Sequence, residues 1–126
     1  MLSILDTSVL IRDDLAEIDG QLGVSAVSIA ELQFGVLVTK NPEHRAMRLA
    51  RLTAILQTFD PLPVNTRIAA SYGQLAALTH QAGKKSKARN LDLMIAATAH
   101  AHGARLVTAN PTDVKHLKSV LEIVAL

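Results

Sequence analysis

Cysteine and tryptophan do not occur among the 126 residues, and there are only one tyrosine and two phenylalanines. The lack of cysteine excludes disulfide bonds, thiolate zinc sites and cysteine nucleophiles, and it favours a reducing compartment. The aromatic residues Phe34, Phe59 and Tyr72 are not spaced as a stacking platform. This argues against the base-stacking sheet surfaces that many single-stranded RNA binders use.

We also expect no targeting or membrane-spanning segment. The N-terminus MLSILDTSVLIRDD has no basic segment, and Asp6 interrupts it before an apolar stretch of signal length forms. The other apolar runs are too short to cross a bilayer. We therefore expect a soluble, cytoplasmic protein without membrane contact. With 49% hydrophobic residues, the chain has enough apolar surface for one core, so residues 1–126 are expected to form a single domain.

Short apolar segments alternate with longer helical patterns. Strands are expected at residues 2–5, 105–109 and 121–126, while the proline-rich segment 60–64 is suited only to starting a short one. Helices are expected after Asp6 and from about residues 28, 42, 66 and 90, the last two ending at Gly83 and Gly103. Strands joined by such helices form parallel βαβ units. We predict an α/β protein with three layers, α/β/α, around a central, mostly parallel sheet.

Two helices carry signals at their N-termini. Ser28 and Glu31 have the spacing of a capping box, and Asn41 followed by Pro42 is typical of an N-cap and first helical position. The helix after Pro42 is expected to have an apolar side and a solvent side. The apolar side comprises Met47, Leu49, Leu52, Ile55 and Leu56, and the solvent side Arg45, Arg48 and Arg51.

Asp92 lies inside the otherwise apolar run NLDLMIAA, residues 90–97. A helix of these residues is apolar on every side through its first turns, so we expect Asp92 to be carried into the interior. An unpaired buried carboxylate is costly. Its charge must therefore be compensated by a helix N-terminus, an Arg or Lys partner, or a metal ion.

Three further acids map to the same edge of the predicted sheet. Asp6 ends the first strand, Asp113 follows the strand at 105–109, and Glu31 falls in the first turn of its helix. Ligands of open parallel sheets bind beyond the carboxyl ends of the strands. Carboxylates gathered there repel one another unless one is protonated or a cation joins them. Oxygen ligands without cysteine favour Mg²⁺ or Mn²⁺, ions that activate water for phosphoryl chemistry.

The segments ILDTSVLI (4–11), SIAEL (28–32) and NLDLMIAATAHAHGARLVTAN (90–110), with Asp113, resemble the PIN-domain ribonucleases, specifically the VapC toxins of bacterial toxin–antitoxin pairs. The resemblance covers nearly the whole chain. It implies a Mg²⁺- or Mn²⁺-dependent endoribonuclease in which metal-activated water hydrolyses RNA phosphodiester bonds. Its catalytic acids are Asp6, Glu31, Asp92 and Asp113, its metal ligands Asp6, Asp92 and Asp113, and its supporting hydrogen-bonding residues Thr7, Ser8, Thr108 and Asn110. Val114 departs from the family pattern, which often has an aromatic residue there.

The resemblance also implies partners: cellular RNA, a small VapB-like antitoxin that blocks the site, and a second copy in a homodimer and larger toxin–antitoxin complex. The apolar segment 32–38 offers surface for a dimer. The chain has 13 Lys and Arg against 11 acids, four of which belong to the site, so the remaining surface is positive. Candidate contacts to the RNA backbone are Lys84, Lys85, Lys87 and Arg89.

Simpler interpretations remain open for each of these residues. Asp6 suits an N-cap, Glu31 a capping box, and Asp92 a helix dipole. Asp113 suits an Asx-turn, and the basic run suits a solvated loop. Two other functions also remain open: a catalytically silent module that binds nucleic acid or protein, and a phosphoacceptor or phosphatase-like domain with a covalent Asp6. Haloacid-dehalogenase-like enzymes need a second Asp two places on, where Ser8 stands.

Overall fold

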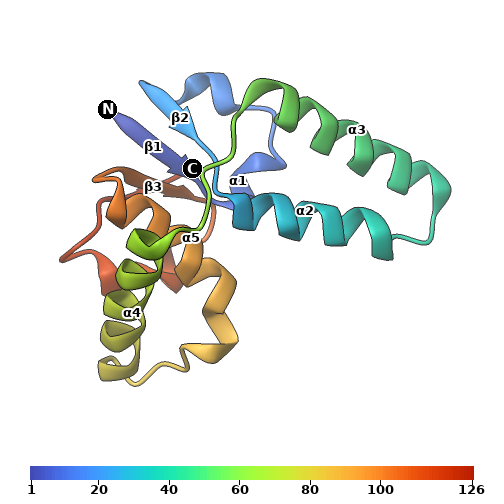
Figure 1. Ribbon diagram of the computed structural model, residues 1–126. Helices are drawn as coiled ribbons and strands as arrows, with labels where there is room; N and C mark the ends of the chain where they lie inside the picture. Colours follow the sequence, from blue (N-terminus) through green and yellow to red (C-terminus); the bar gives the residue numbers. More distant parts are fainter.

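Four parallel strands form the centre of the fold (Figure 1). The computed structural model describes residues 1–126, apart from the side chain of Ala88. The strands are β1 (Leu2–Leu5), β2 (Gln21–Gly23), β3 (Arg105–Thr108) and β4 (Ile123–Ala125). The helices are α1 (Thr7–Leu10), α2 (Ala26–Val38), α3 (Pro42–Thr58), α4 (Thr66–Gln81) and α5 (Asn90–Ala101). Short 3-10 turns lie at Leu15–Glu17, Lys87–Arg89, Pro111–Asp113 and Lys115–Leu117.

The strand order is β2-β1-β3-β4, and every neighbouring pair is parallel. Strands β1, β3 and β4 match the predicted strands, whereas β2 was not predicted. It has only three residues, one of them glycine, so it lacks the β-branched run that marks a strand in a sequence. Because β1 and β3 are adjacent, the residues that follow them meet at one edge of the sheet.

Helices cover both faces of this sheet, which confirms the predicted three-layer α/β/α arrangement. Ile4 and Leu106 belong to a core cluster with buried side chains of α4 and α5. Leu5 and Val107, one position along in each strand, belong to a second cluster with α1 and the end of α3. Side chains that alternate between two buried faces explain why these strands read as continuous apolar runs.

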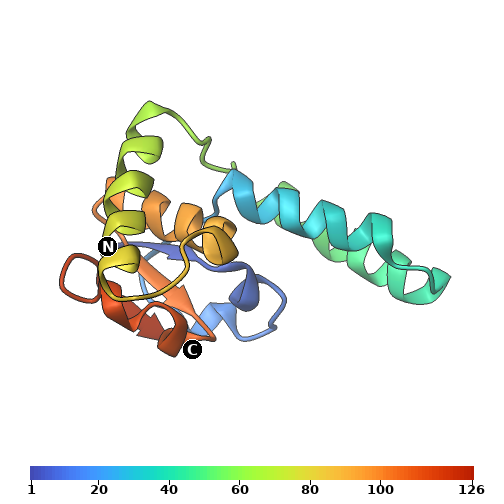
Figure 2. The same ribbon diagram turned by 90° about the horizontal axis from the view of Figure 1, so that it is seen from below.

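Helices α2 and α3 run side by side as an arm that extends away from the sheet (Figures 1 and 2). The predicted apolar side of α3 is therefore only partly correct. Leu52 and Ile55 are buried, but Met47 is 68% exposed, and Leu49 and Leu56 are exposed as well. Met47 and Leu49 lie in the outer half of α3, which has only α2 beside it, whereas Leu56 is next to the buried Ile55 and faces away from the core.

The helix ends follow local chemistry. Asn41 caps α3 and Asn65 caps α4, each through its side-chain oxygen, and Gly83 and Gly103 follow α4 and α5 with positive φ. The predicted capping box is wrong, because α2 begins earlier: Ser25 is the N-cap and accepts from the Val27 N–H. The proline-rich segment contributes one bridge, between Leu62 and Ser25. Among the described residues, the helices are too short or too polar to cross a membrane.

Candidate active site

The carboxyl ends of β1 and β3 and the first turn of α5 enclose a small hollow. Asp6, Asp92 and Asp113 line it together with Thr108 and Asn110, and its volume is about 30 Å³. The three acids come from positions far apart in the sequence, and parallel β1 and β3 bring Asp6 and Asp113 to the same edge. The fold therefore gathers acids where open α/β sheets bind their ligands.

Asp6 does not cap a helix, although it occupies the N-cap position of α1. Its side chain makes no capping hydrogen bond. Instead, Oδ2 of Asp6 accepts hydrogen bonds from the hydroxyls of Ser8 (2.7 Å) and Thr108 (2.9 Å). Each hydroxyl is in turn oriented by a backbone N–H, from Ala109 to Ser8 Oγ and from Asn110 to Thr108 Oγ1. These contacts orient the Asp6 carboxylate at the hollow.

The predicted supporting residues thus take distinct roles. Ser8 and Thr108 support Asp6 directly, and Asn110 acts through its backbone N–H to Thr108. Thr7 supports Glu31: its hydroxyl donates to Glu31 Oε1 at 2.8 Å and lies 2.9 Å from the buried Ser28 Oγ. Ser28 was predicted as a helix cap, but it belongs to this network.

Glu31 lies in the second turn of α2 rather than the first, because the helix begins at Ala26. It is half-buried, and burial is the largest cause that raises the pKa of its carboxyl. The Thr7 hydrogen bond lowers that pKa, while the negative charges of Asp92 and Asp6 raise it. A carboxylate with a raised pKa is better suited to hold or transfer a proton near neutral pH.

Asp92 lies in the first turn of α5, but it is not buried as predicted. Residues 91 and 92 are both exposed, Leu91 to 52%, because the helix turns Leu93 and Ile95 toward the core instead. Neighbouring atoms still desolvate the carboxyl, and this is the largest cause that raises the pKa of Asp92. The charges of Asp6 and Asp113 raise the pKa further, and Arg89 lowers it.

Asp113 lies in the 3-10 turn after β3, with 53% of its side chain exposed. Its carboxylate is 3.7 Å from the Arg89 guanidinium, and Arg89 also donates to the Asp113 carbonyl oxygen. Of the predicted basic run, Arg89 is therefore the residue brought to the acids. Lys84, Lys85 and Lys87 line a different surface hollow, with His80 and Gly83.

The donor set at this edge suits a hard divalent cation. All four acids offer oxygen ligands. Burial is the largest cause that raises the pKa of Glu31 and Asp92, and repulsion from the neighbouring acids raises it further. The hollow has room for roughly two water-sized occupants. Within the described part of the chain, however, no three Asp, Glu or His side chains stand ready to ligate one ion. Ion binding would therefore need side-chain rotation, which exposed Asp92 and Asp113 permit.

The position of α3 beside the site was not predicted from the sequence. Arg48 and Arg51, which were predicted to face solvent, line a hollow together with Glu31. Their three-residue spacing on one helical face was visible in the sequence, but the position of α3 relative to Glu31 depends on tertiary structure.

This geometry defines the chain as an α/β protein with acids at the carboxyl edge of a parallel sheet. A PIN-domain family model matches residues 3–118. Ribonuclease VapC4 of Mycobacterium tuberculosis is 33% identical over 112 residues, which cover 84% of each chain. The chain therefore belongs to the PIN-domain family and, within it, to the VapC ribonucleases.

Solved structures agree. The crystal structure of VapBC-5 from Mycobacterium tuberculosis, a member of the VapBC family of toxin–antitoxin systems, matches with a TM-score of 0.87 and 31% identity, covering 99% of this chain and 98% of that one. FitAcB from Neisseria gonorrhoeae matches with a TM-score of 0.79 and 26% identity, covering 97% and 96%. The predicted family and fold are confirmed.

Proposed function

We propose that this chain is the toxin of a toxin–antitoxin pair and an endoribonuclease that hydrolyses RNA phosphodiester bonds with Mg²⁺ or Mn²⁺. The observation that carries the proposal is the meeting of Asp6, Asp92 and Asp113 in one hollow, with Glu31 close enough to Asp6 and Asp92 for their charges to raise its pKa. The VapC ribonucleases among its relatives support the reaction class.

The residues divide into a binding set and a proton-transfer set. Asp6, Asp92 and Asp113 would hold the cation, and Ser8 and Thr108 orient Asp6 for this role. When bound, the cation supplies a Lewis acid that lowers the pKa of water and stabilises charge on the phosphate. Glu31 takes the proton of the attacking water at Oε2, because Thr7 already occupies Oε1 and burial raises its pKa.

The proposed partners follow from surface chemistry. VapBC-5, the structural relative described above, is a toxin–antitoxin system. Exposed Phe34, Leu37 and Val38 on the arm give this chain apolar surface for a VapB-like antitoxin or for a second copy in a homodimer. The cytoplasm is the proposed location, because the proposed substrate is cellular RNA.

A cleavage assay tests this function. Purified protein should cut RNA in Mg²⁺ or Mn²⁺ and stop when a chelator is added, and Asp6→Asn should abolish cleavage while leaving the circular dichroism spectrum unchanged. Asp19→Asn, which removes the same charge from an exposed position, is the matched control and should cleave normally. A folded protein that cuts no RNA in any divalent cation would instead favour the silent binding module.

The phosphoacceptor alternative has a specific observation against it. Ser8, at the position where haloacid-dehalogenase-like enzymes carry their second Asp, donates its hydroxyl hydrogen bond to Asp6 Oδ2. This neutral hydroxyl cannot serve as the general acid that such chemistry needs. Phosphorylated Asp6 detected after incubation with a phosphodonor would revive that alternative.

A further inference from the structure

A second hollow lies beside the acids, between α1, α2 and α3. Its volume is about 300 Å³, and it is lined by Ile11, Glu31, Leu32, Gly35, Arg48 and Arg51. Glu31 belongs to this lining and also lies near Asp6, because Thr7, the residue after Asp6, donates a hydrogen bond to Glu31 Oε1 at 2.8 Å. The arginine hollow, as we name this space, therefore opens directly beside the acids.

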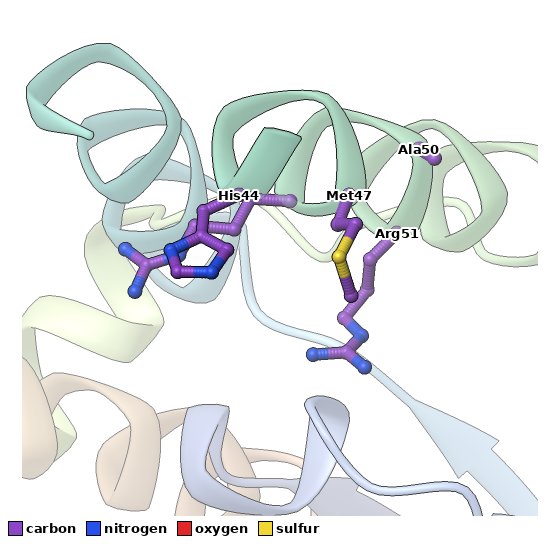
Figure 3. Close-up of a pocket in the computed structure, with 5 residues that line it drawn as sticks. His44, Met47, Ala50 and Arg51 are labelled. Atoms are coloured by element: carbon purple, nitrogen blue, oxygen red, sulfur yellow. The ribbon is translucent and has the colours of Figure 1, made fainter. Parts of the chain in front are cut away.

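Arg48 and Arg51 also line another hollow, which lies farther out along α3. Its volume is about 520 Å³, and His44, Met47 and Ala50 complete its lining. Figure 3 shows the side chains of His44, Met47 and Arg51 extending from the same side of α3. A basic face thus leads from the middle of the arm to Glu31.

Among the described residues, the arginines on this face form no close ion pair. Ion pairs among the described residues are Arg12–Asp14 and Arg89–Asp113, and neither involves α3. Arg48 makes one long hydrogen bond, 3.4 Å from Nη1 to the Gly35 carbonyl oxygen. Glu31, the acid of the lining, already accepts a hydrogen bond from Thr7. The guanidinium groups therefore keep free donors in the planar geometry that suits phosphate oxygens.

We propose that the arginine hollow is a subsite for the nucleotide adjacent to the cleaved phosphodiester, with Arg48 and Arg51 binding its phosphate. This inference rests on the proposed ribonuclease function. A single strand whose scissile phosphate lies at the acids presents its next phosphate to one side, and the arginine hollow supplies the complementary charge. Ile11, 49% exposed, and Leu32 offer apolar contact to sugar and base. Phosphate contacts fix the register of the strand and carry little sequence information.

RNA binding measured without cleavage tests the subsite. Fluorescence anisotropy of a labelled RNA hexamer would be recorded in chelator, with Asp6→Asn as the parent, over a range of salt concentrations. Losing the contacts to one phosphate should reduce the slope of log K against log salt by about 0.7, which is about fivefold in affinity at 0.1 M salt. Because both arginines are placed on one phosphate, Arg48→Ala/Arg51→Ala should show this full reduction and each single variant a part of it. Arg48→Lys keeps the charge but not the planar donors, so it should restore the slope more fully than the affinity.

Arg45→Ala is the matched control, since it removes the same charge from an exposed α3 position that lines neither hollow. Its slope and affinity should equal those of the parent. In wild-type background, the Arg48 and Arg51 variants should raise KM and leave kcat nearly unchanged, as expected for uniform binding.

Four results would overturn the subsite. Arg45→Ala weakening RNA binding as much as Arg51→Ala would mean a general charge effect. Unchanged RNA binding together with abolished inhibition by a protein antitoxin would assign the hollow to that protein instead. If the Asp6→Asn parent bound no RNA and the wild-type chain cut none, the proposed function would be overturned as well. If the wild-type chain cut RNA normally and the Arg48 and Arg51 variants bound RNA as the parent does, the subsite alone would be overturned.

Discussion

Thr7→Val removes one hydroxyl from the network behind Glu31 and keeps the shape of the side chain. That hydroxyl is 2.8 Å from Glu31 Oε1 and 2.9 Å from Ser28 Oγ, and Ser28 is fully buried. The substitution therefore removes a hydrogen bond to a carboxylate and leaves a buried serine oxygen without its partner. Thr7→Ser is the matched control, because it retains the hydroxyl.

The expected loss of stability is about 2 kcal/mol at neutral pH. A hydrogen bond to a charged group contributes roughly 1.5–3 kcal/mol, reduced here because half-exposed Glu31 recovers part of it from water, and an unsatisfied buried hydroxyl costs roughly 1–3 kcal/mol. For a domain of this size, that corresponds to a drop in melting temperature of about 6–10 °C.

The pH dependence has a definite sign. The Thr7 hydrogen bond lowers the pKa of Glu31, so its stabilisation is present while Glu31 is charged and is lost as pH falls through that pKa. Thr7→Val should therefore cost less at pH 4 than at pH 7.5. Removing the bond also raises the pKa of Glu31 further, so the acid limb of the kcat/KM profile should move to higher pH.

Thermal denaturation at the two pH values and a cleavage pH profile would check these outcomes. The double variant Thr7→Val/Ser28→Ala should be less destabilised than the two single losses added together, because the orphaned serine oxygen is gone. Equal stability of Thr7→Val and Thr7→Ser, or an acid limb that moves to lower pH, would refute this role of the Thr7 hydroxyl.

Two further predictions concern charge and backbone. In the metal-free protein, the raised pKa of Asp92 means that stability falls as pH rises from about 4 through that pKa. Asp92→Asn should therefore melt at a higher temperature than wild type at pH 7, and this gain should vanish near pH 3. A lower melting temperature of Asp92→Asn at pH 7 would contradict repulsion among the acids. Gly20 has φ +87°, and a Cβ there would lie 2.5 Å from the Met1 carbonyl oxygen. Gly20→Ala should cost more than the roughly 1–2 kcal/mol of left-handed strain that Gly83→Ala costs in open space, and equal denaturation midpoints would refute this.

Elements fixed by local chemistry were predictable from the sequence. Asn41 and Asn65 cap their helices because a side-chain oxygen reaches N–H groups two or three residues away, which spacing alone reveals. The acids after β1 and β3 were predictable too, since parallel strands with helical connections leave little choice of edge. The start of α2 was not, because Ser25 and Ser28 both suit a cap.

The exposure of individual side chains was harder to predict from the sequence. Met47 and Leu49 match a helical apolar pattern, but the arm projects from the body and leaves them in solvent. Asp92 shared an apolar run, yet only Leu93 and the residues after it in that run face the core. Periodicity gives the face of a helix, whereas tertiary packing decides which faces are covered. For the same reason, Arg48 and Arg51 could not be placed beside Glu31 from their spacing.

Manganese binding addresses the central claim most directly, because it requires no substrate. Mn²⁺ titrated into metal-free protein and followed by electron paramagnetic resonance should saturate at the acids, with affinity lost in Asp6→Asn and in Asp92→Asn and kept in Asp19→Asn. Equal Mn²⁺ affinity in wild type and both site variants would contradict a cation shared among these carboxylates.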